Sequence, residues 1–427
     1  MTKLSILGGL LVALAAFDSV SAALPAHLHS KRHLFERRDH AAKLVARKHK
    51  YPDTFTVPDP SLLPAAWKKA LNDAVSAGKI PNIPPSTLDA DGNPSYPRGT
   101  DAKKIGSWTL DKYLGPKDIS QAPDGVWAIG FDDGPTDVSP PLYQFLTEQK
   151  QPATHFMIGS NIVSYPDEFM QANATGGQLA VHTWSHELQT SLTNEQVLGD
   201  LGWTMQIIYD RTGRIPNLWR PPQGDVDNRV RAIAEEVLGL HTVLWKADSN
   251  DWCLGDNFKT TCGSDNAVGQ SYDSVMKYIQ QHLHGSKNPG VILLEHEIHV
   301  PAIKIFKDYY PELKQLGWKA QAVGQFDKQD GWYANAANHT SSTTGQKQIL
   351  AADAVSITSS SPAPQLSSNG SSASGSGAST PSASSGSASS AASKQSSSTN
   401  GTGALSRPGQ YAGMALAVGA ALFVLFL

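Results

Sequence analysis

Strand and helix patterns alternate along residues 125–325 of this chain, and this alternation constrains the fold most. Seven short apolar runs fit strands: Val126–Phe131, Thr154–Ile158, Leu179–His182, Asn217–Arg220, Thr242–Lys246, Val291–Glu295 and Lys319–Val323. Because strands that alternate with helices form parallel sheets, we predict an α/β fold with a parallel sheet. Seven such units over this length favour a distorted (β/α) barrel of seven or eight units.

Helix start and stop signals lie between several of these runs. Thr193-x-x-Gln196 has the form of a capping box and is followed by an amphipathic run that Gly213 ends. Asp227 and Asp273 each precede a further amphipathic run, ended by Gly239 and Gly285 respectively. These signals predict three crossover helices.

Polar side chains stand at the ends of the predicted strands. Asp132 and Asp133 close the first, and the later ends carry His182, Arg220, Asp248 and His296. Since catalytic groups in such barrels gather at the carboxyl ends of the strands, we expect these side chains to converge.

Two of these motifs carry the groups of a metal site. His182 and His186 are spaced i and i+4, so on one helical turn they would face the same way. A neighbouring carboxylate would complete a two-histidine, one-carboxylate set with open positions for water and substrate. Successive strand side chains point to opposite faces, so one of Asp132 and Asp133 would remain free as a base.

Each motif alone also has a plainer interpretation. Asp132-Asp133-Gly134-Pro135 is typical of a turn, and a His-x-x-x-His spacing often arises by coincidence. Arg220-Pro221-Pro222 fits a rigid loop, and His296 could be a hydrogen-bonded residue at a strand end. Their order and spacing together are more specific than any one of them.

Taken in order, the motifs resemble those of the polysaccharide deacetylases with the NodB homology domain, carbohydrate esterase family four. Five motifs can be placed over roughly half the chain: Gly130–Pro135, His182–His186, Arg220–Gly224, Asp248–Trp252 and Leu294–His296. The chain has Gln223 where the family usually has an aromatic residue, and Gly130 where it often has Thr. Neither departure removes a catalytic group.

The resemblance implies a role for each motif residue. Asp133, His182 and His186 would bind one divalent metal ion, with Zn²⁺ the default and Co²⁺ or Mn²⁺ also accepted by such a set. The catalytic group would be Asp132 as base, Arg220 holding it ionised, His296 as acid and Asp248 tuning its protonation. The backbone N–H of Gln223 would contact the oxyanion, and Trp252 and Leu294 would enclose the acetyl methyl.

The family resemblance also implies a class of substrate. Three terminal segments resemble those of the chitin-deacetylating members from fungi, which convert chitin to chitosan at the cell wall. They are a signal peptide (residues 1–22), a Ser-rich stalk (340–402) and a C-terminal apolar tail (403–427). Acetylated xylan or peptidoglycan are alternative substrates. A catalytically inactive chitin-binding wall glycoprotein is an alternative of another class.

The first 124 residues divide into three segments. Residues 1–22 fit a secretory signal peptide, with a membrane anchor as the alternative that the short apolar run disfavours. Residues 23–50 carry eight basic and two acidic residues and fit a basic pro-segment. Residues 51–124 are Pro-rich, and we expect one helix near Ala65–Ala77 in an otherwise extended strap packed on the barrel of residues 125–330.

The C-terminal part has a different composition. Residues 340–402 are rich in Ser, Thr and Ala and are expected to form a disordered stalk. Residues 403–427 fit a GPI-attachment signal with Asn400 as the attachment residue, which would place the secreted protein at the cell membrane and wall. A C-terminal transmembrane helix is the alternative.

Secretion has further consequences. Cys253 and Cys262, the two cysteines of the chain, are expected to form a disulfide. Apart from the sequon at Asn400, the Asn-x-Ser/Thr sequons predict glycans at Asn173, Asn338 and Asn369. The net charge of −3 argues against a nucleic-acid partner, and we expect a monomer.

Overall fold

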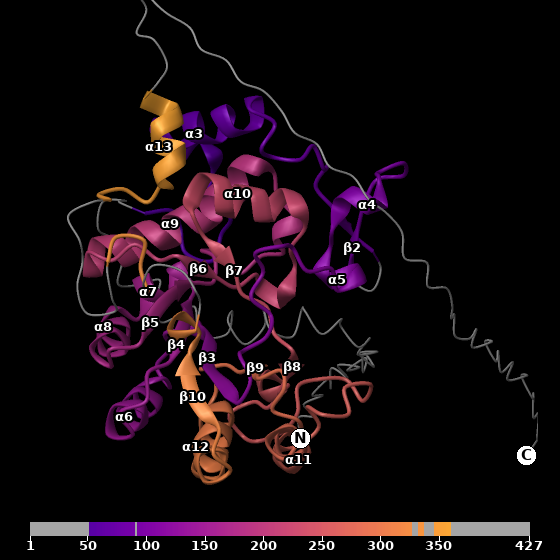
Figure 1. Ribbon diagram of the computed structural model, residues 1–427, viewed down its shortest axis with the longest axis vertical. Coiled ribbons are helices and arrows are strands. Elements are labelled where there is room, and N and C mark those ends of the chain that lie inside the picture. The colour runs from indigo at the N-terminus through magenta and orange to yellow at the C-terminus, as the bar shows by residue number, and fades with distance from the viewer. Residues whose placement is uncertain (1–50, 90–91, 327–331, 337–345, 360–427) are drawn as a thin grey trace, which may run out of the picture. The chain divides into compact units, whose positions relative to one another are not determined.

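The computed structural model describes residues 51–89, 92–326, 332–336 and 346–359, and an eight-stranded sheet lies at their centre (Figure 1). The strand order is β7-β6-β5-β4-β3-β9-β8, and β10 also pairs with β3. All of these pairings are parallel. The strands are β3 (Val126–Gly134), β4 (Thr154–Met157), β5 (Gln178–Val181), β6 (Leu218–Trp219), β7 (His241–Thr242), β8 (Ala247–Asp248), β9 (Val291–Leu294) and β10 (Lys319–Ala322).

One chain segment joins the two edges of this sheet. The sequence predicts a single strand over Thr242–Lys246. The structure instead has two short strands, β7, which ends at Thr242, and β8, which begins at Ala247. The segment pairs with β6 at its start and with β9 at its end, so it bends from one edge to the other. This bend gives the curled parallel sheet of a distorted (β/α) barrel, and the predicted fold class is confirmed.

The strands are buried because helices cover the outside of the sheet. Every residue of β3, β4, β5 and β9 is buried, which explains why these strands read as continuous apolar runs. The covering helices are α6 (Pro140–Glu148), α7 (Gly159–Ser164), α8 (Pro166–Ala174), α9 (Asn194–Thr212), α10 (Asn228–Leu238), α11 (Tyr272–Leu283) and α12 (Val300–Gln315).

The predicted helix boundaries follow from capping chemistry. Thr193 and Gln196 form the predicted capping box of α9, and Gly213 ends it in a left-handed conformation. The Asp227 carboxylate accepts the Val230 N–H at the start of α10. The start of α11 differs: Ser271 caps it, and Asp273 lies inside its first turn.

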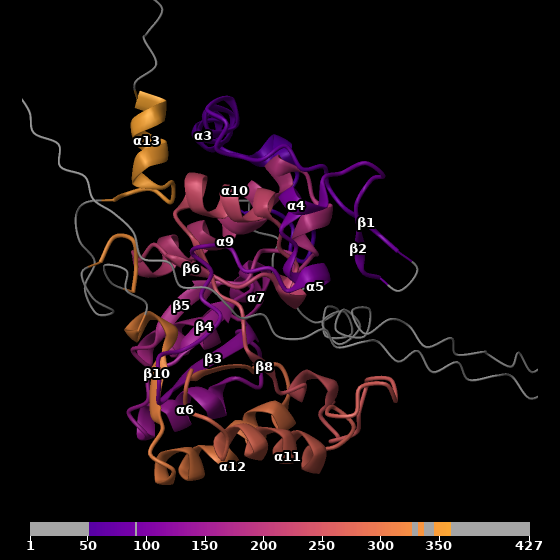
Figure 2. The ribbon, with the colours of Figure 1, turned by 45° about the vertical axis from the view of Figure 1, so that its right-hand side comes forward.

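The N-terminal segment shares the core of the barrel. Its helix α3 (Ala65–Ser76) packs against α9, α10 and the later helix α13 (Ala352–Ser359) (Figures 1 and 2). A side chain at Gly202 of α9 would meet the Trp67 ring at 2.7 Å, so α3 sits close against α9. The segment also holds the short helices α4 (Ala102–Ile105) and α5 (Trp108–Asp111) and a ribbon of β1 (Thr87–Leu88) and β2 (Pro94–Ser95), which the sequence did not predict.

The proposed signal peptide, pro-segment and GPI signal lie outside the described residues. Asn338, Asn369 and Asn400 lie outside them as well. The stalk predicted over 340–402 is described over 346–359, where the expectation of disorder is wrong, because α13 forms there and Ile349, Leu350 and Ala354 are buried. Among the residues that are described, no helix has the length and apolar character needed to cross a bilayer.

Candidate active site

The two adjacent carboxylates lie at the end of β3, where the strand is irregular. The register of β3 against β4 shifts between Asp132 and Gly134, and Asp133 has a φ of 69°. The expectation that strand alternation separates the two side chains is therefore wrong. The irregular backbone lets both carboxylates approach one ring: Asp133 Oδ1 lies 3.1 Å and Asp132 Oδ2 3.8 Å from His182 Nε2.

The histidine pair lies on a loop after β5 and not on a helical turn. Thr183 and His186 have φ values of 64° and 59°, and the His186 N–H donates to Thr183 Oγ1 at 3.0 Å. The buried Asp200 of α9 holds this loop, because its carboxylate accepts the Ser185 N–H at 2.9 Å and the Ser185 hydroxyl at 3.0 Å. The loop geometry therefore brings both rings to one side.

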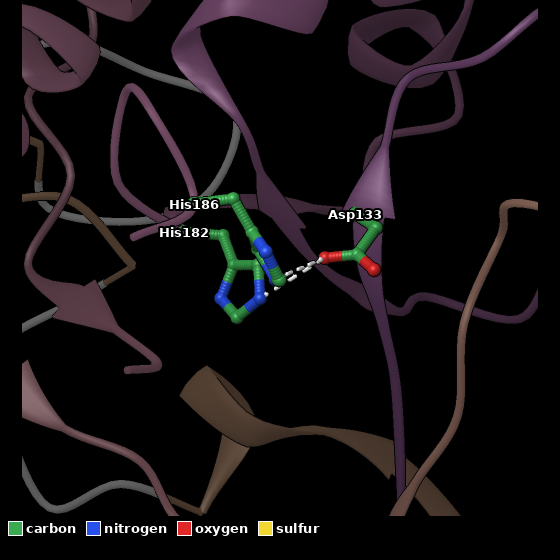
Figure 3. A group of neighbouring side chains, drawn as sticks. All are labelled: Asp133, His182 and His186. Carbon is green, nitrogen blue, oxygen red and sulfur yellow. Dashed lines mark ion pairs between the residues drawn. The ribbon is translucent and has the colours of Figure 1, made fainter. Parts of the chain in front are cut away.

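Asp133, His182 and His186 form a buried cluster that could hold a metal ion (Figure 3). Asp133 Oδ1 lies 3.1 Å from Nε2 of each ring. Burial opposes ionisation of Asp133, but the contacts with His186 and His182 outweigh it and lower the pKa of this carboxyl well below its usual value.

The tautomer of His182 indicates what fits between these atoms. His182 Nδ1 lies 2.7 Å from the Arg220 carbonyl oxygen, which can only accept, so Nδ1 carries a proton and Nε2 is the nitrogen that can bind a cation. Asp133 Oδ1 is buried and has no hydrogen-bond partner among the described residues, and a cation between it and the two Nε2 atoms would supply its missing partner. The cluster therefore fits a divalent metal ion.

Arg220 contacts both the metal-binding cluster, through its carbonyl oxygen near His182, and the carboxylate of Asp132. Its Nη1 donates to Asp132 Oδ1 at 2.7 Å, and both side chains are buried. The guanidinium also lies 4.1 Å from the Phe156 ring centroid, which restricts where it can point. Arg220 thus holds the Asp132 carboxylate from behind, as the resemblance implies.

The ring of His296 has a different hydrogen-bond partner from the expected Asp248. Its Nδ1 lies 2.7 Å from Asp251 Oδ1, and Asp251 Oδ2 accepts the His296 backbone N–H at 2.9 Å. Burial would lower the pKa of His296, but Asp251 and the two β3 aspartates outweigh it and raise this pKa to about 10.

Asp248, which we expected beside His296, accepts the Asn250 N–H at 2.8 Å instead. Burial raises the pKa of Asp248 to about 6, and His296 contributes only a weaker, lowering effect. The contact assigned to Asp248 from the sequence therefore belongs to Asp251.

These groups converge on one pocket of about 190 Å³. Its lining includes every substrate-contacting residue predicted from the sequence and one that was not, Trp245. The lining residues are Asp132, Asp133, His182, His186, Gln223, Trp245, Asp248, Trp252, Leu294 and His296.

Asp200, Asp251 and Trp245 were not predicted as site residues from the sequence. Asp251 lies in the motif Asp248–Trp252, but the sequence does not tell which of its two carboxylates turns inward. Trp245 lies in the bend between β7 and β8, where a strand was predicted. Asp200 lies inside a helix, with no local signal of its contact to Ser185.

Two predicted modification sites can be placed. Cys253 and Cys262 form a disulfide beside the pocket residue Trp252, with an S–S distance of 2.03 Å. Asn173 lies in α8, and its side-chain oxygen accepts a hydrogen bond from Arg214. Glycosylation of Asn173 remains a prediction.

This chain is similar in sequence to a family model and to curated proteins. The family model for polysaccharide deacetylase matches residues 120–243, from the approach to β3 through β7. Chitin deacetylase 3 of Cryptococcus neoformans is 43% identical over 291 residues, 67% of this chain and 67% of that protein. Chitin deacetylase of Amylomyces rouxii is 41% identical over 232 residues, 52% of each.

A solved structure of the chitin deacetylase from Colletotrichum lindemuthianum is 22% identical with a TM-score of 0.42, and covers 49% of this chain and 90% of that one. The family model covers residues 120–243, which include Asp132, Asp133, His182 and Arg220, and the similarity to the Cryptococcus protein extends over two thirds of both chains. The chain belongs to the polysaccharide deacetylase family.

Proposed function

We propose that this protein hydrolyses the N-acetyl groups of N-acetylglucosamine units in chitin, giving chitosan and acetate, with the help of one divalent metal ion. The observation that supports this most is the convergence of a three-ligand cluster, an arginine-held carboxylate and a carboxylate-held histidine on one pocket. Amide hydrolysis needs these functions: an activated water, stabilisation of an oxyanion and protonation of the leaving amine.

Asp133, His182 and His186 would hold the metal. An ion with nitrogen and oxygen ligands and open positions supplies Lewis-acid chemistry, which lowers the pKa of water toward about 7 and polarises a carbonyl. Zn²⁺ is the ion we propose, and Co²⁺ or Mn²⁺ also suit this ligand set.

Asp132 would be the general base. Arg220 binds its Oδ1, so Oδ2 is the oxygen turned toward His182 and the cluster. The Arg220 guanidinium holds this carboxylate in place while Oδ2 takes the proton of the attacking water.

His296 would be the general acid. Because Asp251 occupies Nδ1, the second ring nitrogen Nε2 is the one that can donate a proton to the leaving amine. The pKa of about 10 keeps the ring protonated near neutral pH. After the transfer, Asp251 still fixes the orientation of the ring.

The remaining pocket residues would position the acetamido group. Trp252 and Leu294 line the pocket and offer apolar surface for the methyl group. The backbone at Gln223 has a φ of 56°, and we propose that its N–H contacts the developing oxyanion.

Chitin is the substrate we favour because the relatives at 43% and 41% identity are named chitin deacetylases. We also propose that the protein is secreted and held at the cell membrane and wall by a GPI anchor. Acetylated xylan and peptidoglycan remain the alternatives to be tested, as does an inactive chitin-binding role.

The test is acetate release by the purified protein from chitin oligomers, acetylated xylan and peptidoglycan, with Asp132→Asn as the matched control. We expect acetate from the chitin oligomers and almost none from the variant. Release from xylan or peptidoglycan alone would replace the substrate, and binding of chitin without acetate release would replace the activity.

A further inference from the structure

A second, larger hollow adjoins the catalytic pocket. Its volume is about 650 Å³, and it shares Gln223, Trp245 and Asp248 with the catalytic pocket. Pockets that enclose drug-sized ligands measure roughly 300–1,000 Å³. The catalytic pocket, at about 190 Å³, lies below this range, so the acetamido group can enter it while the rest of a sugar polymer must lie elsewhere.

The N-terminal segment, which lies mostly before the residues matched by the family model, builds one wall of this hollow. The wall consists of Trp108 of α5, Lys112 and Leu114. The Trp108 ring packs edge-on against Trp245 with centroids 4.6 Å apart. A side chain at Gly224 would meet Trp108 at 2.1 Å, so the absence of one lets the segment dock closely on the barrel. The wall is therefore fixed relative to the catalytic pocket.

The hollow offers surfaces that suit a sugar ring. Sugar rings have apolar C–H faces and a polar rim, and aromatic side chains attract such C–H groups to their faces. Trp245 and Tyr278 line the hollow and are half-buried. Leu114 also lines the hollow and is 44% exposed, and Leu110 and Tyr113 of the same short segment are 47% and 40% exposed. Exposed apolar side chains gathered in one segment are typical of a binding surface.

The charges of the hollow indicate which sugar unit it takes. Its charged lining residues are Lys112, Lys246 and Asp248, two cations and one anion. Lys112 Nζ lies 3.7 Å from the Trp108 ring centroid, which holds the ammonium at the wall. An N-acetylated unit is neutral, whereas a deacetylated unit carries an ammonium group that these lysines would repel.

We propose that this hollow binds the sugar unit next to the reacting one, and that Lys112 makes it prefer an N-acetylated neighbour to a deacetylated one. The inference rests on the proposed function and adds a specificity-determining residue to it. It assigns to the N-terminal segment a part in choosing where along a polymer the enzyme acts.

The experiment compares acetate release from fully N-acetylated pentamers and from pentamers that already contain glucosamine. We expect wild type to prefer the fully acetylated substrate in kcat/KM. Lys112→Glu replaces the repelling charge by an attracting one and should reduce this preference by at least about threefold, the scale of one partly exposed charge pair. Lys112→Gln should give an intermediate preference, and added salt should reduce the wild-type preference.

Lys319→Glu is the matched control. Lys319 is exposed at the start of β10, and the catalytic groups lie at the opposite, carboxyl ends of the strands. This control should keep the wild-type preference. If wild type is active and Lys112→Glu keeps its preference, the inference is wrong and the proposed function stands. If wild type releases no acetate from either pentamer, both are wrong.

Discussion

Asp251 binds His296 at two points: its Oδ1 lies 2.7 Å from the ring Nδ1, and its Oδ2 accepts the backbone N–H of the same residue at 2.9 Å. One carboxylate thereby sets both the charge and the position of the proposed acid. Asp248, three residues earlier, lines the catalytic pocket with His296, but its carboxylate accepts the Asn250 backbone N–H.

Replacing Asp251 by Asn should therefore weaken the acid. The positive charge on His296 loses its nearest counter-charge, so the pKa of His296 should fall from about 10 and the alkaline limb of kcat/KM should move to lower pH. We also expect kcat to fall by about 10²-fold. The pH profile checks this, with Asp248→Asn as the matched variant. An equal shift in both variants would contradict the assignment to Asp251.

Substitutions of the base Asp132 and of the metal ligand His186 should differ in their effects on metal content. Asp132→Asn should keep the bound metal and lose activity by about 10²–10⁴-fold, because only the base is removed. His186→Ala should lose both the bound metal and the activity, because it removes a ligand whose Nε2 lies 3.1 Å from Asp133 Oδ1. Metal content by elemental analysis, read beside acetate release, distinguishes the two. Wild-type metal content in His186→Ala would overturn the ligand set.

Asp200 should support metal binding without touching the metal. Its carboxylate fixes Ser185 between the two histidines, so Asp200→Ala should weaken metal affinity by about tenfold or more. Asp200→Asn keeps one acceptor for the Ser185 N–H and should be closer to wild type. Competition with a chelator measures the affinity.

Asp210→Ala, on the exposed side of the same helix, is the control for the Asp200 variants. It should leave the metal affinity as in wild type. A loss of thermal stability in Asp200→Ala with unchanged metal affinity would make Asp200 a purely structural residue.

Asp225 should make stability depend on pH. It is buried beneath the loop at Thr190, whose N–H it accepts at 2.8 Å, and burial raises its pKa to about 6. The folded protein thus holds this proton after the unfolded chain has released it near pH 4, so its contribution to stability is present at low pH and is lost as pH rises through about 6.

Asp225→Asn removes this titration. Between pH 4.5 and pH 7, the free energy of unfolding of wild type should fall relative to the variant, by on the order of 1–3 kcal/mol. Urea unfolding at both pH values measures it, and Asp124→Asn, at an exposed position, should follow wild type. A difference that grows in the opposite direction would contradict the buried, proton-binding role of Asp225.

The sequence predicted the strands and the site residues for related reasons. Strands buried on both faces read as apolar runs, and the polar residues that end them, such as Asp133 and His182, stand out against those runs. Capping chemistry placed α9 and α10 in the same way.

The residues that were mispredicted depend on backbone geometry that no periodicity encodes. Asn250, with a φ of 56°, begins the turn that brings Asp251 to His296. The left-handed conformations of Thr183 and His186 replace the expected helical turn. The contact between Trp108 and Trp245 joins segments far apart in the chain, which a local pattern cannot predict.

We propose that the cluster of Asp133, His182 and His186 holds a divalent ion on which hydrolysis depends. The most direct measurement is acetate release from chitin oligomers by one preparation before chelation, after chelation and after Zn²⁺ is restored. We predict that release is lost with the metal and returns with it. Release that continues in protein shown to be free of metal would contradict the claim.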